Sequence, residues 1–88
     1  MDKLQGMQLF TRVVESGSFT TAAEQMGMSR ALASKVMRNL EDALGVRLLN
    51  RTTRRVSLTD PGRNYYQRVS EILTQLSEVE AEAANLQV

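Results

Sequence analysis

The chain has 88 residues, of which 42% are hydrophobic, 24% charged and 5% aromatic, and its formal net charge is +1. That length fits one small domain with an appendage and excludes a multidomain enzyme. Because the sequence holds no Cys and no His, cysteine-ligated metal sites, disulfides and His-based triads are excluded. No apolar run is long enough to span a membrane, and the first residues lack the apolar core of a secretory signal. We therefore expect a cytoplasmic protein without a metal or cofactor.

The small net charge conceals an asymmetry along the chain. Residues 29–68 carry nine Arg and Lys against three Asp and Glu, a net charge of +6, whereas residues 69–88 carry four Glu and no base. A segment this basic is the electrostatic signature of a phosphate-binding surface. On charge alone, a solvated basic face that binds nothing stays open as the alternative.

An amphipathic helix is predicted at the N-terminus, over about residues 2–15. Met7, Phe10 and Val14 recur at helical spacing and define one buried stripe. The tripeptide at residues 16–18 ends this helix, because Gly17 accepts a left-handed conformation at no steric cost.

A helix-turn-helix is predicted next. A short helix from about residue 19 to 26 is capped by Ser18 or by Thr21, the latter with Glu24 at capping-box spacing. Gly27 provides the turn, and Ser29 is the N-cap of a third helix, which continues to residue 44. Two helices joined by about three residues with a leading glycine are typical of the helix-turn-helix motif.

The third helix has two faces of opposite character. The predicted buried face consists of Ala33, Val36, Met37, Leu40 and Leu44. The opposite face is basic over three turns, as in a recognition helix whose Arg and Lys bond guanine and whose small apolar residues touch thymine methyls. Glu41 and Asp42 lie further along, where we expect a solvated surface that repels phosphate. The predicted DNA-facing residues are Arg30, Ala31, Ser34, Lys35 and Arg38.

A β-hairpin wing is predicted after Gly45. The apolar period changes there to that of two short strands, around residues 46–49 and 56–58. Three arginines lie between the strands, and Arg at a wing tip suits the narrow minor groove, although it could equally clamp phosphate. Arg51 fits either a DNA contact or an internal anchor of the hairpin.

A long helix is predicted from the Thr-Asp-Pro-Gly start at residues 59–62 to the end of the chain. Its apolar residues alternate at spacings of three and four over three heptads, the pattern of a coiled coil. A helix of about 28 residues would be roughly 40 Å long, which one small domain cannot cover. A second chain is therefore expected along it, with a solvated or frayed tail as the alternative. The predicted dimer contacts are Val69, Ile72, Leu76, Val79 and Ala83.

Three stretches of the sequence carry a more specific signal: residues 17–24 (GSFTTAAE), residues 40–49 (LEDALGVRLL) and residues 51–59 (RTTRRVSLT) with Gly62. Together they resemble the N-terminal DNA-binding domain of LysR-type transcriptional regulators, over residues 1 to about 76. The resemblance implies a mainly α winged helix-turn-helix at residues 1–58 and a linker and dimerisation helix at residues 59–88. Complete regulators of that family add an effector-binding domain, which is absent from this chain.

The resemblance also implies partners and contacts. It implies a homodimer with antiparallel linker helices on double-stranded DNA, at an A/T-rich interrupted inverted repeat, and it leaves room for higher oligomers of a complete protein. The family commonly has Ser-Gln-Pro or Ser-Pro-Ser at residues 29–31, so whether Arg30 reads guanine or phosphate stays open. The family's DNA-contacting positions fall on Ser29, Arg30, Ala31, Ser34, Lys35, Arg38, Arg51 and Arg54, with Ser18 and Thr20 at a place that often touches phosphate.

Three classes of function compete for this sequence. The first is a dimeric, sequence-specific DNA-binding domain of a bacterial transcriptional regulator. The second is a dimerisation module in which the basic face is incidental. The third is an enzyme, which is least favoured. The sequence has no His or Cys for catalysis, and so small a domain has little room for a water-excluding pocket.

Overall fold

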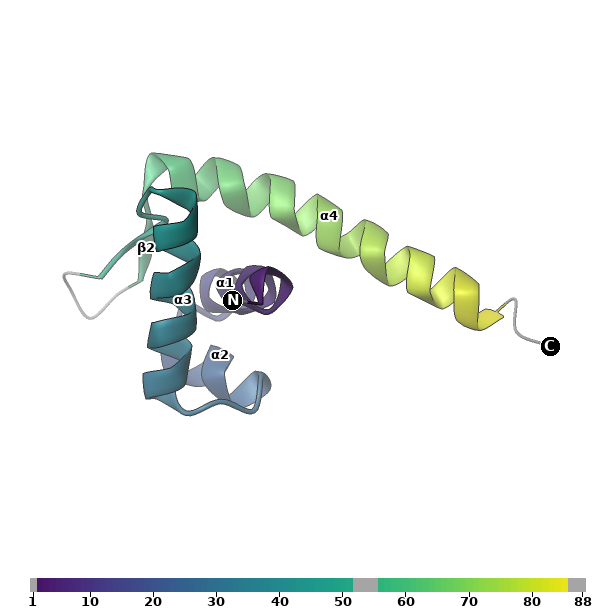
Figure 1. Ribbon diagram of the computed structural model, residues 1–88, viewed down its shortest axis with the longest axis horizontal. Coiled ribbons are helices and arrows are strands. Elements are labelled where there is room, and N and C mark those ends of the chain that lie inside the picture. Colours follow the sequence, from purple (N-terminus) through teal and green to yellow (C-terminus); the bar gives the residue numbers. More distant parts are fainter. Residues whose placement is uncertain (1, 52–55, 86–88) are drawn as a thin grey trace.

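The computed structural model describes residues 2–51 and 56–85. They form a helical domain from which a hairpin and one long helix extend (Figure 1). The fold is mainly α, a winged helix-turn-helix followed by a long helix, as the sequence predicts. The elements are α1 (Lys3–Ser16), α2 (Phe19–Gln25), α3 (Arg30–Leu44), β1 (Leu49–Asn50), β2 (Ser57–Leu58) and α4 (Asp60–Asn85).

The first three helices each begin at a side-chain N-cap. The carboxylate of Asp2 accepts from the Gln5 amide at 3.0 Å, and the hydroxyl of Ser29 accepts from the Leu32 amide at 3.1 Å. Of the two candidates for α2, Ser18 is the cap, since its hydroxyl accepts from the Thr21 amide at 3.1 Å. Thr21 lies inside the helix, so the predicted capping box with Glu24 is wrong. These caps satisfy amides that the helices leave unpaired.

The turn between α2 and α3 depends on Gly27. This residue has a φ of +68°, in the left-handed region that glycine enters without a steric penalty. Its amide donates to the Glu24 carbonyl at 3.1 Å, and the Met28 amide donates to the Ala23 carbonyl at 2.9 Å. Because Ala23 is only 2% exposed and small, the chain can fold back closely over α2. The turn thereby sets the position of α3 against α2.

The core lies between α1, α2 and α3. Of the stripe predicted on α1, Phe10 is fully buried while Met7 and Val14 are half-buried; Leu9 and Val13 complete the buried face. The buried face is wider than predicted because α1 contacts α2, α3 and α4. The prediction for the buried face of α3 is confirmed for its first four residues. It is wrong for Leu44, which is 37% exposed, whereas Leu48 and Leu49, after the chain reversal, are buried.

The wing begins later than predicted. Leu49 pairs with Leu58 and Asn50 with Ser57 in a two-stranded antiparallel sheet. Val46 precedes the strand and is 43% exposed, so the expectation of a strand starting there is wrong. Residues 46–48 instead carry the chain back from the end of α3. The residues between Arg51 and Val56, including the predicted contact Arg54, lie outside the described part of the chain.

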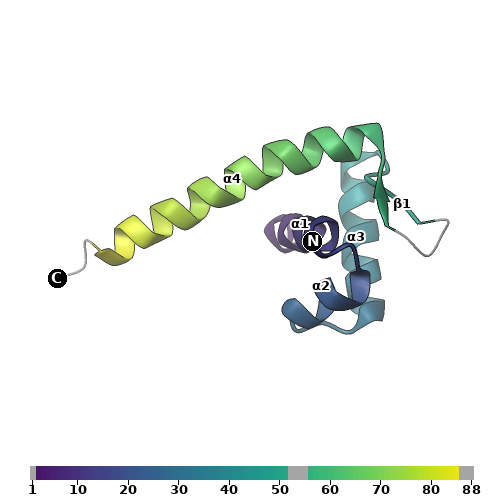
Figure 2. The same cartoon turned by 180° about the vertical axis from the view of Figure 1, so that it is seen from behind.

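Aromatic packing fixes α4 against α1. The ring of Phe10 lies 5.4 Å from the ring of Tyr65 and 6.3 Å from that of Tyr66, measured between centroids. The hydroxyl of Tyr66 donates to the Glu15 carboxylate at 3.0 Å. Val69 is also buried, and α4 still lies beside α1 at Leu73 and Leu76. The C-terminal part of α4 then extends beyond the helical domain, which both views show (Figures 1 and 2). No helix in residues 2–51 or 56–85 is long and apolar enough to cross a membrane.

Candidate nucleic-acid interface

The outer face of α3 presents the predicted basic residues to solvent. Arg30, Lys35 and Arg38 are exposed, with Ala31 beside them and Ser34 half-buried between them. The apolar face packed against α1 includes Ala33 and Met37, both fully buried, so the two faces lie on opposite sides of one helix. Within the described ranges, no carboxylate lies within ion-pair distance of these three bases. Their charges are therefore free to meet phosphates or base edges.

Two of the predicted hydroxyl contacts, Ser18 and Ser29, already cap helices. The Ser18 and Ser29 oxygens cap α2 and α3 by accepting one backbone amide each, and each hydroxyl keeps its own proton to donate to a further partner. Thr20 is exposed one residue into α2. These residues lie at the starts of α2 and α3, with Ser29 adjoining the basic face.

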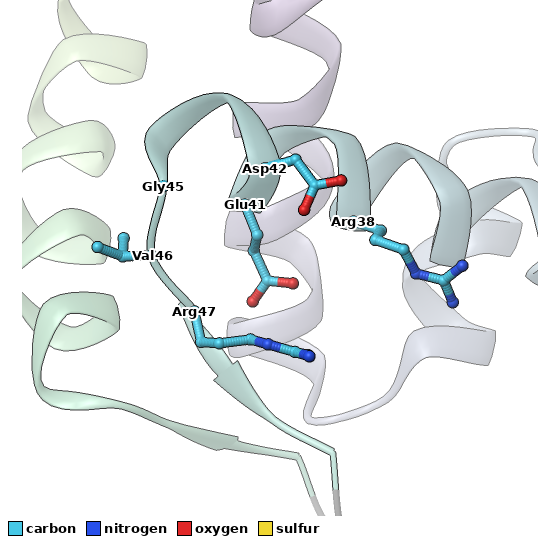
Figure 3. A pocket seen from close by; sticks show the side chains of 6 residues that line it. All are labelled: Arg38, Glu41, Asp42, Gly45, Val46 and Arg47. Atoms are coloured by element: carbon cyan, nitrogen blue, oxygen red, sulfur yellow. The ribbon is translucent and has the colours of Figure 1, made fainter.

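Arg47 is an exposed base that the sequence analysis did not single out. It lies in the chain reversal after Gly45. Its side chain borders a hollow of about 400 Å³ together with Arg38, Asp42 and Val46 (Figure 3). No ion pair holds Arg47 within the described ranges. The sequence indicates Arg47 only through its position in the basic segment of net charge +6. The strand expected at residues 46–49 gave no reason to predict it as a DNA contact.

Glu41 is buried, contrary to the expectation of a solvated surface. It is 4% exposed, whereas its neighbour Asp42 is exposed. One carboxylate oxygen of Glu41 accepts from the backbone amides of Leu48 at 2.7 Å and Leu49 at 3.2 Å. A buried carboxylate needs such donors, because it would otherwise lose its hydration without compensation.

Arg51 is turned inward rather than outward. Its Nη2 donates to the second oxygen of Glu41 at 2.6 Å, and its side chain is 23% exposed. Its guanidinium carbon also lies 5.4 Å from the ring centroid of Phe19, at the start of α2. This geometry is that of an internal anchor of the hairpin, one of the two roles that the sequence left open.

The predicted dimer stripe on α4 divides into two parts. Val69 is 2% exposed within a single chain, so its side chain packs in its own domain and has almost no surface available to a partner. Ile72 and Val79 are 51% and 60% exposed, and Ala83 is also exposed. Leu76 is half-buried beside α1 residues Gln8 and Thr11. Heptad spacing alone does not distinguish a contact inside the chain from one between chains.

Comparison with known proteins gives a consistent result. The family described as "Bacterial regulatory helix-turn-helix protein, lysR family" matches residues 4–63. A transcriptional repressor of Pseudomonas aeruginosa, PA14_22550, is 49% identical over 92% of this chain and 26% of its own length. The Escherichia coli transcriptional activator AaeR is 47% identical over 90% of this chain and 26% of its own length.

Solved structures agree with this match. The crystal structure of the BenM_DBD/catB site 1 DNA complex superimposes with a TM-score of 0.90 at 31% identity, over 94% of this chain and 92% of that one. The chain therefore belongs to the lysR family of bacterial regulatory helix-turn-helix proteins, as a DNA-binding domain of that family. It spans about a quarter of the length of the two named relatives.

Proposed function

We propose that this chain binds double-stranded DNA sequence-specifically as a homodimer, within a bacterial transcriptional regulator, and has no catalytic activity. In this proposal residues 1–58 read the DNA and residues 59–88 link and pair two protomers. The observation that carries it is the face of α3, whose three exposed bases have no carboxylate partner among residues 2–51 and 56–85. Such a helix, supported from behind by a helix-turn-helix, fits the major groove.

The assigned contacts follow from this placement of α3. Arg30, Lys35 and Arg38 bond guanine edges or phosphates, Ser34 bonds a base or phosphate, and Ala31 touches a thymine methyl. Near the starts of α2 and α3, the hydroxyls of Ser18, Thr20 and Ser29 donate to phosphates of the DNA backbone. In the wing, Arg54 enters the minor groove, where A/T-rich sequence gives the most negative potential. The family resemblance places Arg51 at the DNA as well, but its guanidinium is turned inward onto Glu41.

The dimer is proposed from the exposed part of the α4 stripe. Ile72 and Val79 expose more than half of their surfaces in one chain, and Ala83 continues the same stripe. A second copy that covers Ile72, Leu76, Val79 and Ala83 removes this apolar surface from water. Two-fold pairing then places two copies of α3 on the same side of the DNA and predicts an inverted repeat.

Charge along α4 favours antiparallel pairing. Its first part carries Arg63 and Arg68, while Glu71, Glu78, Glu80 and Glu82 follow with no base among them. Parallel pairing would bring like-charged acidic halves together, whereas antiparallel pairing places the acidic half of one helix beside the basic start of the other. The antiparallel arrangement implied by the family is therefore also the one that these charges favour.

The salt dependence of DNA affinity tests the proposal against a dimerisation module. A DNA-binding face releases counterions, so log K should fall with log salt by about 0.9 per phosphate neutralised. Lys35→Ala should reduce this slope by about 1, while the control Lys3→Ala on α1 should leave it unchanged. A wild-type chain that shows no measurable affinity for any duplex at low salt would refute the proposal.

A further inference from the structure

One carboxylate holds the base of the wing to the end of α3. The Glu41 backbone carbonyl accepts from the amides of Gly45 at 2.8 Å and Val46 at 3.3 Å, which closes the helix and reverses the chain. Its side chain then accepts from the amides of Leu48 and Leu49 and from the guanidinium of Arg51. Glu41 therefore bonds the chain at the reversal and on both sides of β1.

Arg51 completes this connection from the other end of the strand. It directly follows Asn50, the last residue of β1, and leads into residues 52–55 of the predicted wing tip. Its planar guanidinium bonds Glu41 on α3 and lies near the Phe19 ring on α2, so one side chain contacts both helices of the helix-turn-helix. The direction in which β1 leaves the domain is thus fixed relative to α3.

This geometry leaves Arg51 poorly placed for DNA. A phosphate would have to compete with a carboxylate oxygen 2.6 Å from Nη2, and only 23% of the side chain is exposed. The charge of Arg51 is compensated by a buried partner, whereas Arg30, Lys35 and Arg38 are exposed and form no ion pair within the described part of the chain. We propose that Glu41 and Arg51 are a positioning pair that sets the wing relative to the recognition helix, and that Arg51 does not contact DNA.

This proposal rests on the proposed DNA binding. It predicts that removing the negative charge of Glu41 weakens DNA binding rather than strengthening it. If Arg51 contacted phosphate, Glu41→Gln would remove a competing negative charge and strengthen DNA binding. If the pair positions the wing, Glu41→Gln weakens the bonds to Arg51 and the Leu48 amide, and DNA binding falls although a negative charge has been removed. Asp42→Asn is the matched control, because it removes the same charge from the next residue of α3. The Asp42 side chain is exposed, and Figure 3 shows it separate from Arg47.

The experiment compares affinities of the 88-residue chain and its variants for one mixed-sequence duplex, with folding followed by circular dichroism. Glu41→Gln should bind at least about fivefold more weakly than Asp42→Asn, the low end for losing one well-placed charged contact. Arg51→Lys should lose affinity similarly, because an ammonium cannot reproduce the planar fork. The double variant should lose no more than either single variant. Binding by Glu41→Gln that equals or exceeds that of Asp42→Asn, or full affinity in Arg51→Lys, would overturn the proposal.

Amide exchange gives a readout that needs no DNA. The Leu48 and Leu49 amides should exchange faster in Glu41→Gln than in the wild type, and Arg51→Lys should produce a smaller change at the same residues. Unchanged exchange in both variants would refute the positioning pair even if DNA binding holds. A wild-type chain that binds no duplex would refute the proposed function alone, because the exchange experiment still decides the role of the pair.

Discussion

The α-carbon of Gly62, in the first turn of α4, packs directly against the backbone carbonyl of Leu48, at the base of the wing. A Cβ on Gly62 would overlap the Leu48 oxygen and also lie 3.1 Å from the Thr59 hydroxyl. Thr59 is itself held there, since its hydroxyl donates to the Arg47 carbonyl at 2.6 Å and accepts from the Gly62 amide at 3.0 Å. The long helix and the wing therefore meet through a contact that only glycine permits.

We expect Gly62→Ala to destabilise the chain. The overlap is with backbone, which cannot rotate away, so the cost should lie at the upper end for overpacking, about 3 kcal/mol. Gly6→Ala is the control, because its Cβ would meet the Leu40 side chain at an ordinary 3.4 Å. Within α1, that change should stabilise by about 0.5–1 kcal/mol. Urea unfolding of both variants measures the difference, and equal stabilities would contradict the packing described.

Stability should fall at alkaline pH because of the tyrosines on α4. Burial raises the pKa of Tyr65, and burial together with the hydrogen bond to Glu15 raises the pKa of Tyr66 above 10.0. The folded state then holds these protons more tightly than the unfolded state. The resulting stability is complete below the unfolded pKa and is lost as pH rises from there through the folded pKa.

Tyr66→Phe tests this dependence while keeping the aromatic packing with Phe10. The loss of stability above pH 10.0 should become shallower, although Tyr65 still contributes to it. At neutral pH the lost bond to Glu15 should cost no more than about 1 kcal/mol. Thermal unfolding followed between neutral and alkaline pH gives both quantities. An alkaline slope identical to that of the wild type would show that Tyr66 does not titrate as described.

Arg38→Ala should weaken binding to a specific DNA site by about 1–3 kcal/mol if Arg38 contacts a base. Arg12→Ala is a matched control, because Arg12 lies on α1, where it bonds the Gln25 side chain at 3.2 Å, away from the basic face. Fluorescence anisotropy with specific and scrambled duplexes separates base reading from phosphate binding. Equal affinities of Arg38→Ala and the wild type would remove Arg38 from the interface.

Val79→Asp should convert dimers to monomers. Val79 is 60% exposed in one chain, so the substitution costs the monomer little, whereas a carboxylate buried between two helices is strongly unfavourable. Ala81→Asp introduces the same charge on the opposite side of α4, at another exposed residue, and should leave the dimer intact. Sedimentation equilibrium distinguishes the two outcomes, and a dimeric Val79→Asp chain would exclude this stripe as the interface.

The sequence predicts the features of this chain that local chemistry controls. Caps such as Ser29, the left-handed Gly27 and the basic face of α3 follow from a few adjacent residues and helical periodicity. The burial of Glu41 does not, because it depends on a chain reversal that brings the Leu48 and Leu49 amides to the carboxylate. The burial of Val69 within its own domain is not predictable for a related reason. An apolar residue at a heptad position can pack equally well against its own domain or against a partner.

Selection of binding sites from random duplex DNA by the 88-residue chain, at low and near-physiological salt, tests the central claim most directly. A two-fold dimer that reads bases through α3 should enrich an interrupted inverted repeat at both salt concentrations. Its half-site bases should change when Arg30 or Arg38 is replaced by Ala. Retention of DNA at low salt without any enriched motif would contradict sequence-specific recognition and leave only phosphate affinity.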